Sequence, residues 1–215
     1  MNNMNENDLP LKIAVFPLSN AVFFPGTILP LNVFEDRYIQ LVDDCMKSDR
    51  MFGMIQPKNK LSKSPDVYDV GCLGKIISFN ETSDKRFVIS LSGIIRFRIK
   101  KEQSKEKLYR KFSVDYSDFL NDLKYQKNQI KNNAQENLLQ KIKAYFSKIN
   151  YPVEIAELAK LNIDQLISTV CMISPFSVVE KQKLIETITI ENKLQLLEEI
   201  INFNLFEIQE NKTIQ

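Results

Sequence analysis

A long uncharged apolar stretch, Ile13–Phe34, constrains this chain more than any other segment. It reads IAVFPLSNAVFFPGTILPLNVF and is long enough to cross a membrane as a helix. Proline interrupts it at positions 17, 25 and 30, and each interior proline removes a backbone donor and clashes with the preceding helical turn. The stretch therefore predicts short buried strands joined by fixed turns, with Pro25-Gly26 forming one turn.

Composition excludes several classes of function. The chain has 215 residues, of which 44% are hydrophobic and 26% charged, so it can form one large or two small globular domains. It has no histidine, which removes Ser-His and Cys-His nucleophiles and His-ligated zinc. The net charge of +2 supplies no global field for nucleic acid or anionic membranes. We therefore expect neither an enzyme nor a bound metal or cofactor.

Cysteine usage and the N-terminus indicate a cytoplasmic protein. The three cysteines, Cys45, Cys72 and Cys171, are odd in number and widely spaced, so a secreted disulfide framework is not expected. Residues 1–12 are polar and acidic before the first lysine, and they lack the basic and apolar regions of a signal peptide. We expect reduced thiols, a cytoplasmic location and no membrane attachment.

The first half of the chain has the pattern of a β-rich subdomain, which we place at residues 1–120. One amphipathic helix, with apolar residues at helical spacing from Tyr38 to Met46, interrupts the strands. In Ile95–Lys100, apolar residues alternate with basic ones, which predicts a strand with its basic face in water. Short apolar or alternating runs predict strands at 13–18, 21–24, 51–55, 71–79, 87–91, 95–99 and 112–116. Such a set is typical of a small, partly closed barrel.

The second half predicts a helical subdomain over residues 121–208 and a frayed tail over 209–215. An apolar stripe runs from Ile130 to Ile149, and Asn150-Tyr151-Pro152 ends that helix. Further helices begin near Pro152, Asn162 and Ser177, and Ser177 with Glu180 forms a capping box. A last helix carries Leu194 to Leu205. The fold class is therefore α+β, with a small helical bundle after the barrel.

An ordered set of motifs resembles the substrate-binding N-terminal domain of Lon-type ATP-dependent proteases (protease La). In the β-rich half these motifs are Phe16-Pro17-Leu18, Phe24-Pro25-Gly26, Pro30-Leu31, Val33-Phe34-Glu35, Arg37-Tyr38, Val70–Ile76 with Gly71, and Gly93–Ile99. In the helical half they are Glu180–Glu186 and Lys193–Leu197. The resemblance spans nearly the whole chain in the family's order. It implies a PUA-like pseudo-barrel followed by a helical subdomain.

The resemblance carries over recognition and not proteolysis. Lon proteases continue into an ATPase module and a peptidase module with a serine–lysine dyad, and we expect this chain to be a stand-alone form that lacks both. The sequence has no Gly-x-x-x-x-Gly-Lys-Ser/Thr loop, because Gly71–Ile76 has too short a glycine spacing and ends in isoleucine. The predicted function is a non-catalytic domain for unfolded polypeptides or a protein partner, such as a protease. In a bacterial cell it would be an adaptor or accessory factor in protein quality control.

Five residues are candidates for the polypeptide-binding surface. Phe23 and Phe24 are adjacent in a predicted strand, so one ring of the pair is expected to face outward. Met51, Phe52 and Met54 are the second group, because methionine-rich surfaces adapt to varied partners. An exposed set of these side chains would bind unfolded segments by burying apolar surface.

Other motif residues have structural interpretations. We expect the prolines and Gly26 to fix turns, and Phe16, Phe34 and Phe97 to lie in the core. We expect Glu35 and Arg37 to form an ion pair at the junction between strand and helix. We expect the ring of Tyr38 to pack against other side chains while its hydroxyl finds a hydrogen-bond partner.

An RNA-binding module of the PUA-like kind is the alternative function. It would use the basic region Arg96–Lys111, whose cations are Arg96, Arg98, Lys100, Lys101, Lys105, Lys107, Arg110 and Lys111. Glu102 and Glu106 interleave these cations, and runs of mixed sign rarely form a track for phosphates. We therefore favour a solvated loop there and a polypeptide as the partner. The sequence does not give the oligomeric state.

Overall fold

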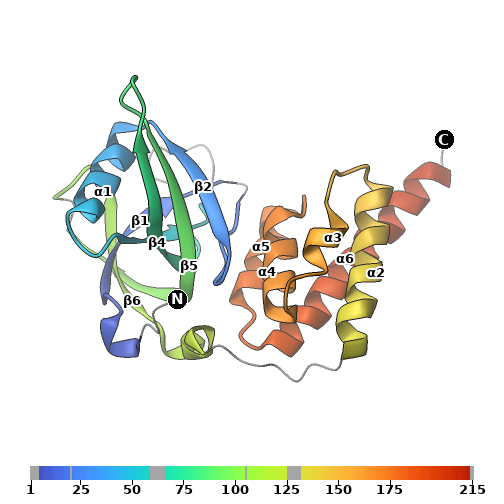
Figure 1. The fold of residues 1–215 in the computed structure, drawn as a ribbon. Coiled ribbons are helices and arrows are strands. Elements are labelled where there is room, and N and C mark those ends of the chain that lie inside the picture. The colour runs from blue at the N-terminus through green and yellow to red at the C-terminus, as the bar shows by residue number, and fades with distance from the viewer. Residues whose placement is uncertain (1–4, 20, 59–65, 105, 125–131, 214–215) are drawn as a thin grey trace. The chain divides into compact units, whose positions relative to one another are not determined.

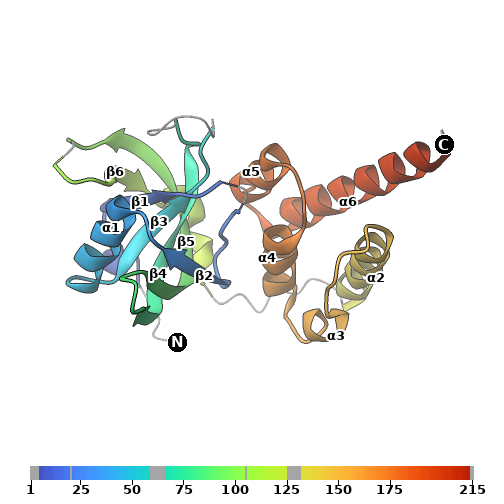
Figure 2. The same cartoon turned by 90° about the horizontal axis from the view of Figure 1, so that it is seen from above.

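The computed structural model describes residues 5–19, 21–58, 66–104, 106–124 and 132–213. Its contacts divide the chain into two units, each described here by itself. The β-rich unit comprises Met1–Tyr125 and Ser177–Glu186, and the helical unit comprises Gln126–Phe176 and Thr187–Gln215. The predicted α+β class is confirmed (Figures 1 and 2). The division differs from the predicted boundary after residue 120, because residues 177–186 pack with the β-rich unit.

A single six-stranded sheet forms the β-rich unit. Its strands are β1 (Lys12–Pro17), β2 (Ile28–Val33), β3 (Met51–Ile55), β4 (Val70–Glu81), β5 (Phe87–Glu102) and β6 (Arg110–Asp115). They lie in the order β2-β5-β4-β3-β1-β6, and β6 also pairs with β5. The sheet thus closes on itself to form a barrel, from which β2 extends as an edge strand (Figure 2). All neighbouring pairs are antiparallel except β1 with β3.

The length of β5 makes this closure possible. It has 16 residues and is one continuous strand, whereas the sequence predicted separate strands at 87–91 and 95–99. Its first part pairs with β2 and its last part with β6, while β4 runs along its other edge. Register shifts between Ile99 and Lys101, and in the β4–β5 ladder, bend the strands enough to curve the sheet.

The turn at Pro25-Gly26 forms as predicted, but the segment before it is not a strand. Gly26 has φ +73°, and the backbone N–H and hydroxyl of Thr27 both donate to the carbonyl of Phe24, at 3.3 and 2.6 Å. A Cβ on Gly93 would collide with that carbonyl, so glycine lets the turn lie close to β5. Residues 21–24 form no ladder in the described structure and instead bury their apolar side chains.

Helix α1 (Asp36–Met46) follows β2 and covers the barrel near β1. The Glu35 carboxylate pairs with Arg37 at 2.7 Å, as predicted. The Tyr38 ring stacks on Phe16, with 3.8 Å between centroids, so both rings lie in the core. Burial of the Tyr38 phenol raises its pKa above the ordinary value.

The prediction for Phe34 is wrong. Phe16 and Phe97 are buried as expected, but Phe34 is 61% exposed. Val33, the last residue of β2, points into the core, so the next side chain faces outward. The Arg86 guanidinium lies 5.9 Å from the centroid of the Phe34 ring.

The helical unit contains α2 (Asn132–Lys148), α3 (Ile155–Leu158), α4 (Ile163–Ile173) and α6 (Ile190–Thr213). Fully buried side chains from three helices form its core, namely Leu138, Ile142, Leu166, Ile167, Leu197 and Ile201. Asn162 caps α4 by accepting a hydrogen bond from the Gln165 N–H at 2.9 Å, as predicted. Helix α6 continues to Thr213, beyond the predicted end at 208, and residues 214–215 lie outside the described residues. No helix in the described ranges is both long and apolar enough to span a membrane.

Candidate functional site

The five predicted binding residues do not form an exposed surface. All five are buried, namely Phe23, Phe24, Met51, Phe52 and Met54. Met51 is the most exposed of them, with 8% of its surface accessible to solvent. Strand β3 lies between β4 and β1 in the sheet, and every residue of Met51–Ile55 is buried on both faces. Both phenylalanines are buried because residues 21–24 are not a strand with two alternating faces. The prediction of an exposed aromatic and methionine surface is therefore corrected.

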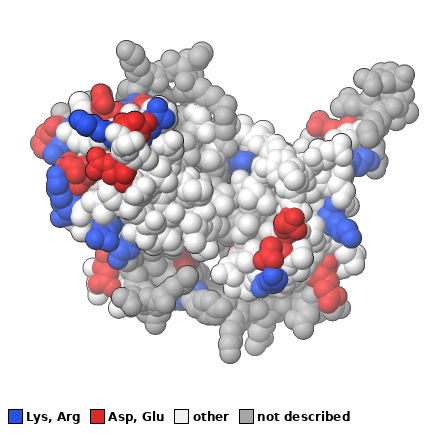
Figure 3. Space-filling view, turned by 45° about the horizontal axis from the view of Figure 1, so that its top comes forward, with Lys and Arg blue, Asp and Glu red and all other residues white. Residues whose placement is uncertain are grey.

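An uncharged face lies instead on three paired strands. We use this name for residues 28–33 of β2, 76–80 of β4 and 87–92 of β5, which contain no Lys, Arg, Asp or Glu. Within it Ile28, Ile77 and Val88 are exposed apolar residues. Figure 3 shows a broad area without charge on the β-rich unit, next to a group of charged residues at the upper left. Such a face can bury apolar groups from a partner.

The basic region of the alternative function is largely paired with carboxylates. Four cations of β5, β6 and their connection lie within salt-bridge distance of an acidic group: Arg98 with Asp118, Lys100 with Asp115, Lys107 with Asp44 and Arg110 with Glu102. The hydrogen bond from Lys100 contributes most to lowering the pKa of the Asp115 carboxyl. These pairs reduce the positive potential available to a phosphate backbone.

Arg96 differs most from its prediction, because it is buried and not on a solvated basic face. Its guanidinium donates two hydrogen bonds to the Asp122 carboxylate, both of 2.8 Å, and a third, of 3.1 Å, to the Ile185 carbonyl. The guanidinium also lies over the Phe119 ring at 4.5 Å. Asp122 and Phe119 belong to the 3₁₀ segment η2 (Ser117–Leu123), and Ile185 belongs to α5 (Val178–Glu186). Arg96 thus joins three segments of the β-rich unit.

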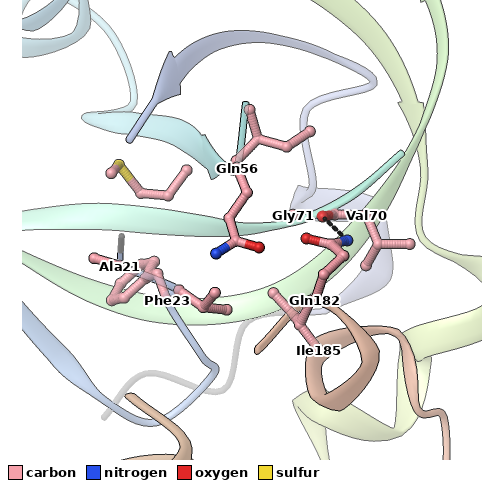
Figure 4. Close-up of a pocket in the computed structure, with 10 residues that line it drawn as sticks. Ala21, Phe23, Gln56, Val70, Gly71, Gln182 and Ile185 are labelled. Carbon is pink, nitrogen blue, oxygen red and sulfur yellow. Dashed lines mark hydrogen bonds between the residues drawn. The ribbon is translucent and has the colours of Figure 1, made fainter. Parts of the chain in front are cut away.

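A small pocket lies where α5 meets the barrel. Its volume is about 10 Å³, and it is lined by Ala21, Val22, Phe23, Met54, Ile55, Gln56, Val70, Gly71, Gln182 and Ile185. The carboxamides of Gln56 and Gln182 are both buried, and both point into it (Figure 4). Gln182 Nε2 donates to the Val70 carbonyl at 3.3 Å and to Glu186 at 2.7 Å. Within the described structure, Gln56 Nε2, Gln56 Oε1 and Gln182 Oε1 have no hydrogen-bond partner.

Sequence reasoning missed both glutamines. Gln56 directly follows the apolar strand β3, and Gln182 lies in a charged helical segment. A polar residue at the end of an apolar run is the sole signal, and it does not distinguish a buried amide from an exposed one.

The described residues show neither a metal-binding cluster nor an exposed thiol. They contain no cluster of three or more Cys, Asp or Glu that could hold a metal ion. The three cysteines are free thiols and are buried. Burial raises the pKa of the Cys45 thiol to about 12, so the reactive thiolate is not populated at neutral pH.

Comparison with known proteins gives one consistent result. The family model described as "ATP-dependent protease La (LON) substrate-binding domain" matches residues 12–202. Lon protease 2 of Myxococcus xanthus is 26% identical over 93% of this chain and 24% of its own length. Lon protease of Syntrophus aciditrophicus is 27% identical over 96% of this chain and 27% of its own length. The chain thus spans about a quarter of the length of these curated relatives.

Two solved structures share the fold. The Lon N-terminal domain protein from Xanthomonas campestris has a TM-score of 0.64 and 20% identity, over 86% of this chain and 96% of that one. The N-terminal domain of Mycobacterium avium complex Lon protease has a TM-score of 0.63 and 14% identity, over 89% of this chain and 98% of that one. At such identities the structures establish the shared architecture.

Proposed function

The chain belongs to the Lon substrate-binding domain family, and on that premise we propose that it is a non-catalytic recognition domain for unfolded polypeptides or a protein partner. The matched model describes substrate binding and no catalytic module. In the cell the domain would serve as an adaptor or accessory factor in protein quality control, in the reducing cytoplasm that its free buried thiols suit.

The uncharged face is the observation that carries this proposal. Its exposed Ile28, Ile77 and Val88 provide apolar area, and its serines and asparagines provide small polar groups without charge. Apolar burial stabilises a complex roughly in proportion to area and without regard to the order of residues in the partner. This is the property that a receptor for many unfolded segments requires.

A titration with one polypeptide in two states tests the proposal. We expect saturable binding of fluorescently labelled, reduced and alkylated α-lactalbumin, and much weaker binding of the native, disulfide-intact form, because folding hides apolar segments. Equal binding of the two forms, or binding of neither, would refute the proposal. Ile28→Asp should weaken binding, and Leu11→Asp is the control, since Leu11 is exposed at 70% but lies outside the uncharged face.

RNA binding is the competing outcome. Filter binding of a single-stranded RNA at about 50 and 200 mM salt would show a steep loss of affinity if phosphates were the ligand. We expect weak binding, because the cations at 98, 100, 107 and 110 are paired with carboxylates. Tight RNA binding with a steep salt slope would replace the polypeptide proposal.

A further inference from the structure

The pocket beneath α5 is lined by buried side-chain polar atoms that lack hydrogen-bond partners in the described structure. Gln56 is 2% exposed, and in the described structure neither atom of its amide group has a hydrogen-bond partner. A third such atom, Gln182 Oε1, lines the same pocket. A buried polar group without a partner has lost its hydration without compensation, so native proteins contain few of them. Three such atoms at one pocket require an explanation.

We propose that this pocket is a latent receptor for the backbone N–H and C=O of one residue in an extended, uncharged polypeptide segment, with Gln56 as its anchor and α5 as its lid. The substrate class rests on the proposed function, whereas the site is separate from the uncharged face. A carboxamide presents a donor and an acceptor side by side. This complements the N–H and C=O of one residue in an extended chain, because both groups of that residue point to the same side of the strand. No lining residue carries a charge, so the pocket selects an uncharged occupant.

The remaining lining residues suit the flanks of such a segment. Phe23, Met54 and Ile55 are apolar lining residues from the β-rich part of the unit and form its apolar wall, and Ile185 lines the pocket from α5. Two of these, Phe23 and Met54, are residues that the sequence predicted as binding residues. Their burial here is compatible with a role in binding only if the pocket widens.

Helix α5 is the element that can widen it. The pocket holds about 10 Å³, which is room for one water molecule and not for a peptide group. The hydrogen bonds that hold α5 on the barrel include one from Gln182 to the Val70 carbonyl and one from Arg96 to the Ile185 carbonyl. Displacement of α5 would uncover Gln56 together with the apolar wall, and the hydrogen bonds that Gln56 gains would offset part of its cost.

Two glutamine variants test the proposal. Gln56→Leu removes the amide anchor and keeps the apolar volume, and Gln195→Leu makes the same change at an exposed position of α6. With a labelled, end-capped peptide of leucine and serine, we expect Gln56→Leu to raise Kd about fivefold or more. Its thermal midpoint should be unchanged or higher, because two unpaired polar atoms are lost. Gln195→Leu should leave both quantities unchanged.

Hydrogen exchange gives an independent readout on the unaltered chain. Peptide addition should speed exchange in α5 and slow it in 51–56, because the lid moves and the anchor is covered. If Gln56→Leu binds as tightly as the unaltered protein, or exchange in both segments is unchanged, the pocket holds only a buried water and this proposal fails. The proposed function would survive that result. If the unaltered protein binds no unfolded polypeptide, both fail.

Discussion

Replacement of Arg96 by methionine should destabilise the β-rich unit more than replacement of any exposed arginine. The Arg96 and Asp122 side chains are 3% and 11% exposed, and their ion pair is 2.8 Å long. Arg96→Met removes the two guanidinium bonds to Asp122 and the bond to the Ile185 carbonyl. Asp122 then remains as a largely buried carboxylate that keeps one described donor, the backbone N–H of residue 96 at 3.0 Å.

The expected magnitude follows from that residual environment. Removing one partner of a buried ion pair typically costs about 3–5 kcal/mol, because the other charge is left uncompensated. The retained backbone hydrogen bond places Arg96→Met near the lower end, at about 3 kcal/mol. Replacing both partners, as in Arg96→Met with Asp122→Leu, should cost less than the single change, since no buried charge remains.

Arg98 provides a matched control. It lies two residues along β5 and pairs with Asp118 of the same η2 segment at 3.1 Å, but its side chain is 41% exposed and that of Asp118 is 43% exposed. An exposed pair contributes little, so Arg98→Met should cost less than about 1 kcal/mol. Urea unfolding followed by the near-ultraviolet dichroism of the tyrosines measures both. Equal costs for the two variants, or a double variant worse than Arg96→Met, would refute the reasoning.

Three further predictions concern other parts of the chain. The thiols should react with a disulfide reagent slowly at pH 8 in the native protein and fast after unfolding, because all three are buried and burial raises the pKa of Cys45 to about 12; a fast native thiol contradicts this. Ser177→Ala should cost about 1 kcal/mol and speed amide exchange in α5, because the Ser177 hydroxyl accepts from the Glu180 N–H at 3.2 Å; unchanged exchange would count against the cap. Tyr109→Phe should raise the pKa of Asp44 toward its ordinary value near 3.8, since the Tyr109 hydrogen bond is the largest cause of its lowering. A lowered carboxyl pKa stabilises the fold above the ordinary value and loses that effect as pH falls below it, so the variant should be less sensitive to acid, as carboxyl NMR and acid titration can measure.

Much of the fold was predictable because local rules agree with the tertiary structure. The Pro25-Gly26 turn needs a positive φ that glycine supplies, and Asn162 and Ser177 cap their helices through hydrogen bonds within three residues. The strand predicted at 21–24 is wrong, because an apolar run alone does not distinguish a hydrogen-bonded strand from an irregular segment that packs into the core. The return of α5 to the barrel depends on contacts between Arg96 and Ile185, 89 positions apart, which no local pattern reveals.

The site was less predictable than the fold. The sequence identified residues of the right apolar type, but Phe24 and Phe52 are core residues with no exposed surface. Exposure at Ile28 and Val88 follows from β2 lying at the sheet edge and from its register with β5, which are long-range properties. Gln56 could not be identified at all, because its lack of a partner is a fact of three-dimensional packing.

The salt dependence of polypeptide binding tests the central claim most directly. If the uncharged face binds apolar segments, the Kd for reduced and alkylated α-lactalbumin should change by less than about threefold between about 50 and 200 mM salt. A Kd that rises tenfold or more over that range would show that charge and not apolar burial drives recognition, and would contradict the account.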